Sequence, residues 1–598
     1  MLFRSVLGAA EYNEALARRL AAERARRKAA GEETDESRRP ILLDYLADPC
    51  PGIEVVDRHT FRLVLPRKYP QIRYWMAMHF FAPIPHEALA FYAEPAFVAR
   101  QLDLNRWPVG SGPFVLREYE PNRRVVLERN GNYRGGVYPS DGAPGDREAG
   151  MLEDAGGRIP FLDRVVITVE REHIPRWNKF MQGYYDFAYV TPEAFEQTIS
   201  LSSTGDSGLS DAMVEKGIRL HLSVEAANYW IGFNMMDDTF GGYTPQKARL
   251  RQAISIALDY NEFLEIFFNG QGLQAQGPVP PGIFGCVEGE AGVNPLTDVW
   301  DPARHRAIRR PIDDARRLMA EAGFADGRGP DGRPLVLHLD HALGGDPAFV
   351  SVLDWLRTRL RLLGIELEER GTELTRYREK LETGNFQSYR QGWLADYPDP
   401  ENFLFLFYGP NSKVISKGEN IPSYQNAEYD RLFEQMEGMM DGPERKAIID
   451  RMVAMLRRDA PIVWGFHPTF HILSHAWHHN GKPREMTHNF LKFHRVDGAQ
   501  RAARQREWNR PVVWPVLAAE ALLMLAVAPL FLRRPPSPGG PDGARRSVPL
   551  QVSGDGGRRS VGAGERPVAE DGARRTMPLQ DDDGGPRFPA AAGGGGPC

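Results

Sequence analysis

The sequence contains little cysteine and lacks the common signatures of catalytic sites. Only three cysteines occur in 598 residues, at Cys50, Cys286 and Cys598, and no two of them form a CxxC pair. They can build neither a disulfide framework nor a zinc knuckle. The phosphate-binding pattern GxxxxGK(S/T) and the hydrolase pattern GxSxG are also absent. We therefore predict a protein that is not an enzyme and that uses no cofactor.

The chain also has no large excess of charge of either sign. It carries 74 Lys and Arg residues against 79 Asp and Glu residues, which leaves a formal net charge of -5. A protein that binds DNA or RNA through the phosphates normally has an excess of positive charge. We therefore predict that nucleic acid is not a partner.

The N-terminus has no long apolar run. Val6 to Ala10 is a short apolar stretch, and Glu11 ends it. A secretory signal peptide has a longer apolar region followed by a cleavage site. The sequence as given therefore shows no signal peptide.

The sequence does have enough apolar material for more than one folded unit. Hydrophobic residues make up 42% and aromatic residues 10% of its length. The clearest local signal is a strand at 335–339, a helix from Asp346 and Pro347 to Gly364, and a strand that begins at Ile365. This order predicts a parallel strand pair with a right-handed crossover.

Other segments show the same mixture of helix and strand. Ala, Glu and Arg favour a helix over 11–30, and Leu16 and Leu20 are its only large aliphatic residues, so we predict a solvated surface helix. Glycine, proline and aspartate mark 136–159 as a long surface loop. We also predict a helix over 311–323 and strands at 114–119, 124–129 and 163–170, the first two forming a hairpin. The fold class is therefore α/β or α+β.

The C-terminal part contains one long apolar run, Val512 to Leu532. Its 21 residues are about the length that crosses the core of a bilayer. Pro515 and Pro529 lie near its ends and Glu520 lies inside it, where an acid is unfavourable in a membrane. We predict a transmembrane helix over 512–532, with a buried or interfacial helix as the alternative. Arginines on both sides leave its orientation open.

Residues 533–598 form a low-complexity tail. The tail has 25 glycine or proline residues and one aromatic residue, Phe588. So few apolar groups cannot offset the loss of chain entropy on ordering, so we predict a disordered tail. Its segment at 542–551 returns with small changes at 571–580, but this repeat is too short and polar for a solenoid. A docking segment and a spacer without function both remain open.

Histidine is concentrated near residue 470. His467, His471 and His475 would share one face of either a helix or a strand, so metal binding is conceivable. Pro468 and nearby aromatic residues favour a strand followed by a loop, and no acid or cysteine joins the histidines at ligand spacing. We therefore predict packing and surface histidines and no metal ligand. The group is His467, His471, His475, His478, His479, His488 and His494.

The segment with the most varied chemistry is SYRQGWLADYPDPENFLF, residues 388–405. Because Pro398 and Pro400 interrupt it, we predict a loop rather than a helix. Arg390 offers a bidentate partner for a carboxylate, Trp393 a stacking surface and Asp396 a counter-ion for an ammonium group. These groups complement a zwitterion such as a peptide, and the alternative is a capped turn with surface charges.

Part of this segment, GWLADYPDPENF at 392–403, resembles the signature of the family 5 extracellular solute-binding proteins. These proteins are the peptide-, dipeptide- and nickel-binding components of ABC importers. Three other stretches, at 108–135, 229–282 and 428–464, resemble the family in the same order. The resemblance covers roughly residues 55–497 and implies a type II, two-lobed periplasmic-binding-protein architecture of the α/β class.

The resemblance also implies how the chain is divided. Family members begin with a signal peptide and an N-terminal portion that supplies strands of the first lobe, so we expect the first lobe of this chain to be incomplete. The expected divisions are 1–107 for the remainder of an N-terminal subdomain, 108–232 for lobe I, 233–462 for lobe II and 463–497 for the return to lobe I.

Five residues take family positions near the ligand. Asp396 matches the residue that pairs with the α-amino group of a peptide, Trp393 matches a tryptophan of the pocket wall, and Arg390 matches an arginine that faces the ligand carboxylate in some relatives. Tyr229 and Asn234 lie where the chain crosses between lobes, so ligand or hinge contacts are expected of them.

The function implied by the resemblance is that of a periplasmic receptor. It would bind short peptides or similar small zwitterions and deliver them to the permease and ATPase subunits of an ABC transporter. The helix at 512–532 would anchor it to the inner membrane. A membrane-anchored sensor on the same fold and a metal or metallophore receptor are the alternatives.

Overall fold

The computed structural model describes residues 6–532, with gaps at 37–38, 40, 42, 46, 192–193, 202–206, 344–347, 483–485 and 487–488. Within this range the chain divides into two compact units, residues 6–505 and residues 506–532. Each unit is described by itself.

The centre of the first unit is a six-stranded mixed sheet. Its strands, in spatial order, are β11 (Leu273–Gln274), β17 (Ile462–His467), β10 (Ala227–Phe233), β16 (Ser388–Leu394), β14 (Val336–Ala342) and β15 (Glu366–Thr372). β14 runs parallel to β15 and β16, whereas the other neighbours are antiparallel. Helix α12 (Ala348–Arg361) connects β14 to β15, so the predicted strand, helix and parallel strand are confirmed. Asp346 and Pro347, the predicted start of this helix, lie outside the described residues.

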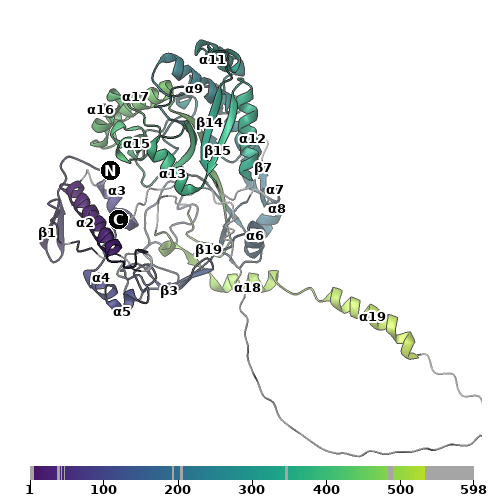
Figure 1. The fold of residues 1–598 in the computed structure, drawn as a ribbon. Helices are drawn as coiled ribbons and strands as arrows, with labels where there is room; N and C mark the ends of the chain where they lie inside the picture. The colour runs from purple at the N-terminus through teal and green to yellow at the C-terminus, as the bar shows by residue number, and fades with distance from the viewer. Residues whose placement is uncertain are drawn as a thin grey trace, which may run out of the picture. The chain divides into compact units, whose positions relative to one another are not determined.

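A hydrophobic core covers each face of this sheet. Figure 1 shows α9 (Pro245–Ala257), α11 (Ile312–Glu321) and α12 on one side of β14 and β15, and α13 (Leu374–Thr383), α16 (Ala427–Glu437) and α17 (Pro443–Asp459) on the other. In β10, Ile231 and Phe233 belong to the core formed with α9, α11 and α12, and Trp230 belongs to the core formed with α13, α16 and α17. With both faces covered, β10 and β17 are largely apolar, whereas β14 and β16 also carry polar side chains such as Asp340 and Arg390.

Two short crossings connect the six-stranded sheet to a three-stranded sheet of β6 (Phe187–Tyr189), β18 (Thr469–Ser474) and β9 (Arg219–Val224). β9 leads into β10 through Glu225 and Ala226, and β17 leads into β18 through Pro468. The N–H group of Glu225 donates to the carbonyl oxygen of Pro468 at 2.8 Å, so the crossings lie side by side. The predicted boundaries of lobe II, 233 and 462, fall at the far ends of β10 and β17, seven and six residues from these crossings, and remain predictions.

Several further predictions about local structure are confirmed. β3 (Phe114–Glu120) and β4 (Arg124–Arg129) form the predicted hairpin, and β5 (Arg164–Thr168) extends it to a three-stranded antiparallel sheet. α11 occupies the helix predicted over 311–323. α2 (Ala9–Ala29) occupies the one predicted over 11–30, and most of its side chains are exposed. Residues 136–159 form no helix or strand, apart from an isolated bridge between Val137 and Arg158.

The remaining α-helices and strands are β1 (Ile53–Asp57), β2 (Thr60–Leu63), α3 (Ile72–Ala77), α4 (His86–Tyr92), α5 (Pro95–Val98), α6 (His173–Met181), α7 (Phe195–Thr198), β7 (Ile199–Leu201), β8 (Ser207–Leu209), α8 (Asp211–Glu215), α10 (Tyr260–Phe268), β12 (Asp298–Asp301), β13 (Arg306–Arg309), α14 (Glu401–Leu404), α15 (Lys413–Ser416), β19 (His478–His479), β20 (Arg495–Val496), α18 (Gly498–Trp508) and α19 (Trp514–Leu532).

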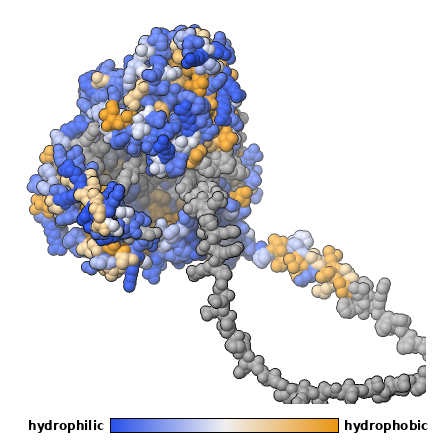
Figure 2. Space-filling model, viewed as in Figure 1, coloured by the Kyte–Doolittle hydropathy of each residue, from blue (hydrophilic) through white to orange (hydrophobic). Residues whose placement is uncertain are grey.

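The surface of the first unit that faces the viewer in Figure 2 is mainly hydrophilic, and its apolar side chains form small separate groups. Exposed apolar side chains that are scattered in this way are normal on a folded protein.

The prediction of a transmembrane helix over 512–532 is not supported. A helix does form there, α19, but it has Pro515 in its first turn and Glu520 inside it. In the part of the chain that the structure describes, no helix combines the length and apolar character needed to cross a membrane. The predicted anchor to the inner membrane, which depends on this helix, is therefore also unsupported. The predicted disorder of 533–598 concerns residues outside the described range.

Candidate functional site

The segment 388–405 is a strand, a turn and a helix, so the prediction of a loop is wrong for its first half. Residues Ser388–Leu394 form β16, which lies between β10 and β14 in the six-stranded sheet. The chain turns at 395–400, and α14 begins at Glu401. Pro398 and Pro400 restrict only the residues next to them, and their influence does not reach back into the strand.

The alternation of side chains along β16 separates two of the predicted site residues. Tyr389, Gln391 and Trp393 line a pocket on one face of the sheet. Arg390 occupies an even-numbered position and therefore lies on the opposite face. Its guanidinium carbon is 5.3 Å from the centre of the Phe349 ring, which belongs to α12. The structure therefore does not bring Arg390 and Trp393 together.

Trp393 and Asp396 are brought together by Asn402, a residue of α14. The indole Nε1 of Trp393 donates to Asn402 Oδ1 at 3.1 Å, and the backbone N–H of Asp396 donates to the same oxygen at 2.8 Å. Asn402 Nδ2 donates to Asp396 Oδ2 at 3.2 Å. A single carboxamide thus connects the indole, the backbone and the carboxylate of the two residues.

This group lies beside the two crossings of the first unit. The N–H of Ala395, which precedes Asp396, donates to the carbonyl oxygen of Ala226 at 2.8 Å. Ala226 belongs to the crossing that leads from β9 to β10. Asp396 is half-buried, whereas Trp393 is buried. Asp396 therefore follows directly on a residue that is bonded to the crossing between the two sheets.

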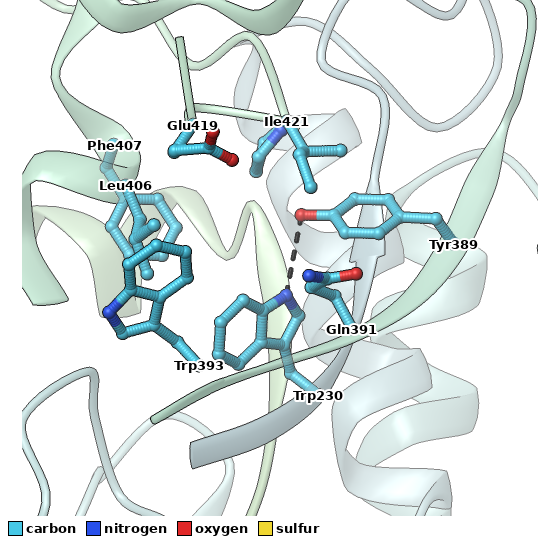
Figure 3. A pocket seen from close by; sticks show the side chains of 9 residues that line it. Trp230, Tyr389, Gln391, Trp393, Leu406, Phe407, Glu419 and Ile421 are labelled. Atoms are coloured by element: carbon cyan, nitrogen blue, oxygen red, sulfur yellow. Dashed lines mark hydrogen bonds between the residues drawn. The ribbon is translucent and has the colours of Figure 1, made fainter. Parts of the chain in front are cut away.

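The pocket next to Trp393 is small and is lined mainly by aromatic and aliphatic side chains. Figure 3 shows the indoles of Trp230 and Trp393 on one side of the pocket and Glu419 and Ile421 on the other, with the hydroxyl of Tyr389 pointing into the pocket near Trp230. Trp230 Nε1 donates to the Tyr389 hydroxyl at 3.4 Å. The carboxylate of Glu419 lies 3.4 Å from Lys413 Nζ, so its charge is partly balanced. The lining is Trp230, Tyr389, Gln391, Trp393, Leu406, Phe407, Glu419, Ile421 and Pro422.

Tyr229 lies on the same face as Arg390. It is paired with Gly392 across the strands, and a side chain at Gly392 would come within 2.4 Å of the Tyr229 ring. Burial is the main cause that raises the pKa of Tyr229 to about 12; the charge of Glu225 adds to the shift and that of Arg390 opposes it. The phenol is therefore un-ionised at neutral pH and acts only as a hydrogen-bonding or packing group.

Asn234 lies at the other end of β10 and holds the backbone. Its Nδ2 donates to the carbonyl oxygens of Gly384 at 3.1 Å and Phe386 at 2.9 Å, and its Oδ1 accepts from the N–H of Met236 at 3.0 Å. These bonds use both amide protons of the side chain. We therefore assign Asn234 to the fold, and its predicted contact with a ligand has no support in these bonds.

A buried acid, Glu401, lies next to Asn402 and was missed in the sequence. Its carboxylate accepts hydrogen bonds from the hydroxyls of Tyr397 at 2.9 Å and Tyr69 at 3.1 Å. Burial is the main cause that raises its pKa to about 8, and the neighbouring charge of Asp399 adds to the shift. Asp399 is itself held by a bidentate ion pair with Arg445, at 2.7 and 2.9 Å. Tyr69 is more than 300 residues away in the chain, so no local pattern could reveal this cluster.

Most of the histidines near residue 470 are buried in the first unit, and His479 is half-buried. His467 Nδ1 lies 2.7 Å from the carbonyl oxygen of Ala227, and His475 Nε2 lies 2.9 Å from that of Phe180. His478 Nε2 lies 3.1 Å from His494 Nδ1. Among the described residues, no three His, Cys, Asp or Glu side chains are arranged to hold a metal ion, and His488 lies outside these residues. The metal-receptor alternative thus gains no support from the described residues.

Comparison with known proteins identifies the family. The family described as bacterial extracellular solute-binding proteins, family 5 (middle), matches residues 15–414, about two thirds of the 598 residues. The chain belongs to this family. The predicted resemblance to the family 5 solute-binding proteins is thereby confirmed at the level of the family.

Individual relatives match a similar part of the chain. This chain is 24% identical over 416 residues to heme-binding protein A of Haemophilus influenzae. The alignment covers 69% of this chain and 63% of that protein. It is 24% identical over 429 residues to di/tripeptide-binding protein 2 of Pseudomonas aeruginosa, in an alignment that covers 71% of this chain and 67% of that protein. It is 22% identical over 420 residues to the periplasmic oligopeptide-binding protein OppA of Salmonella typhimurium (69% and 64%). The chain thus spans about two thirds of the length of these relatives.

Solved structures confirm the fold class. The protein AppA from Clostridium difficile matches with a TM-score of 0.54 at 18% identity, covering 74% of this chain and 78% of the other. DppA from Helicobacter pylori, solved with the peptide STSA, matches with a TM-score of 0.53 at 18% identity, covering 75% and 74%. The fold is that of the type II periplasmic binding proteins, and the predicted incompleteness of the first lobe stays a prediction.

Proposed function

We propose that this chain is the substrate-binding receptor of an ABC importer and that it binds short peptides, or similar small zwitterions, between two lobes in the periplasm. It would deliver them to the permease and ATPase subunits of the importer. The mechanism is a population shift, in which ligand contacts with both lobes favour the closed form. The two adjacent crossings at 225–226 and 468 are the proposed hinge.

The observation that carries this proposal is the position of Asp396. A half-buried carboxylate stands beside the crossings and next to a buried indole, with Asn402 joining the two. A carboxylate in this place complements the α-ammonium group of a peptide, and an indole complements an apolar or aromatic side chain. Several relatives are named for di-, tri- or oligopeptides, which supports the choice of ligand.

Replacement of Asp396 by alanine is expected to weaken binding of a peptide with a free N-terminus. A desolvated ammonium group that loses its partner costs about 2–5 kcal/mol, or about 30-fold or more in affinity. Isothermal calorimetry with di- to pentapeptides measures this loss. Asp313→Ala, which removes a carboxylate that is 84% exposed on α11, is the matched control and should leave affinity unchanged. Equal affinities of wild type and Asp396→Ala would refute the role of Asp396.

Arg390 gives a separate test of how the other end of a peptide is bound. If Arg390 faces the ligand carboxylate, amidation of the peptide C-terminus should weaken binding to the wild type by about tenfold. In Arg390→Met the amidated and free peptides should bind equally. A wild type that binds both peptides equally would leave Arg390 as a packing residue against Phe349.

A further inference from the structure

The side chain of Asn402 is positioned to control the geometry of the proposed site. It is buried, with 1% of its surface exposed, and its carboxamide makes three hydrogen bonds to Trp393 and Asp396. Two of these bonds end on Oδ1 and therefore use both lone pairs of that oxygen. The third directs an amide proton at the carboxylate of Asp396.

The direction of this carboxamide is fixed by its partners. The indole N–H of Trp393 and the backbone N–H of Asp396 are both donors, so only an oxygen can face them. The amide nitrogen must then face Asp396 Oδ2, which is an acceptor. A rotation of the carboxamide by half a turn would place two donors against two donors, so this one orientation is strongly preferred.

The backbone that carries Asn402 is also held firmly. The N–H of Asn402 donates to the carbonyl oxygen of Asp399 at 3.1 Å, and the N–H of Glu401 donates to Asp399 Oδ1 at 2.9 Å. Arg445, which is 1% exposed, holds the carboxylate of Asp399 from α17. The support for Asn402 thus comes from the helix layer of the fold.

We infer that Asn402 is a positioning residue, which sets the orientation of the Asp396 carboxylate and the Trp393 indole before a ligand arrives. This inference rests on the proposed function of Asp396. Asn402 itself need not touch the ligand, since its three bonds are already directed at the two residues that do. A preorganised carboxylate binds an ammonium group more tightly because no side-chain freedom is lost on binding.

The test uses a pair of peptides rather than a single affinity. A tripeptide with a free N-terminus and the same peptide with an N-acetyl group are titrated into the full chain by calorimetry. The wild type is expected to prefer the free amine by about 30-fold or more, because only the free amine pairs with Asp396. Asn402→Ala is expected to reduce this preference by about tenfold, mainly through weaker binding of the free amine.

A merely structural role would give a different result. A general loss of order would weaken both peptides by the same factor and leave their ratio unchanged. Asn234→Ala is the matched control, since it also removes three hydrogen bonds of a buried asparagine but none to Asp396 or Trp393. This variant should have a lower melting temperature and an unchanged ratio. An unchanged ratio in Asn402→Ala would overturn the positioning role.

Failure of the proposed function would look different again. If the wild type binds the free and the acetylated peptide equally, the pairing of Asp396 with an ammonium group is refuted, whatever Asn402 does. In the background Asp396→Ala, the further change Asn402→Ala should leave the ratio of the two affinities unchanged, because the carboxylate through which Asn402 acts on that ratio is gone. If alanine at 402 prevents folding, Asn402→Leu keeps the branched outline of the side chain without its hydrogen bonds and gives the same comparison.

Discussion

The folded protein is expected to lose stability steeply as the pH falls from about 6.5 to about 4. Burial lowers the pKa of His467 to about 4, of His475 to about 4 and of His478 to about 3. The unfolded chain takes up a proton at each histidine below pH 6.5, whereas the folded chain does not, so unfolding becomes easier as the pH falls. At pH 4 each histidine contributes about 3 kcal/mol to this loss, and the three together approach the whole stability of a domain.

Chemical denaturation at pH 7, 5 and 4 measures this effect. His467→Asn is the informative variant, because the Asn amide nitrogen can replace the imidazole nitrogen that faces the Ala227 carbonyl and cannot be protonated. The stability difference between this variant and the wild type should shift by about 3 kcal/mol in favour of the variant between pH 7 and pH 4. His86→Asn, at a side chain that is 86% exposed, should show no such shift. Parallel pH curves for His467→Asn and the wild type would contradict the prediction.

Glu401 is expected to produce the opposite dependence at higher pH. Its folded pKa of about 8 lies above the ordinary value of 4.5, so between these values the folded state keeps a proton that the unfolded state has released. The free energy of unfolding then falls by about 1.4 kcal/mol for each pH unit, or about 5 kcal/mol over the full interval. Above pH 6.5 the histidines no longer titrate in the unfolded chain, and the effect of Glu401 is seen alone. Together the two effects predict greatest stability near pH 6.5.

Glu401→Gln separates this contribution. The amide has the shape of the protonated acid and does not ionise, so the variant should gain stability relative to the wild type by about 1.4 kcal/mol per pH unit between pH 5 and pH 8. Urea titrations at three pH values in this range provide the measurement. Glu87→Gln, at a side chain that is 74% exposed, is the matched control and should follow the wild type. A constant difference between Glu401→Gln and the wild type would show that Glu401 is ionised in the fold throughout this range.

Local patterns were sufficient for the elements that depend on nearby residues. The unit of β14, α12 and β15 follows from a buried strand, apolar residues at helical spacing and Gly364 at the helix end. The hairpin of β3 and β4 follows in the same way. The local pattern predicts a loop at 388–394, because mixed polar and aromatic residues next to two prolines are not typical of a central strand. The segment is nevertheless a central strand, β16, and both of its faces are covered.

The sequence by itself determined the family, the α/β character and the choice of Asp396 and Trp393 as candidates, since each depends on residue types at fixed short spacings. Only the tertiary structure decided how those candidates are arranged. Arg390 and Trp393 lie on opposite faces of one strand, and the side chain of Asn234 is bonded to the backbone. Asn402 connects Trp393 to Asp396 through hydrogen bonds. The tertiary structure also encloses Glu401 between Tyr397 and Tyr69. The alternation of side chains along a strand puts Arg390 and Trp393 on opposite faces. The burial of Glu401 requires two segments far apart in the chain to meet in one core, which no local pattern encodes.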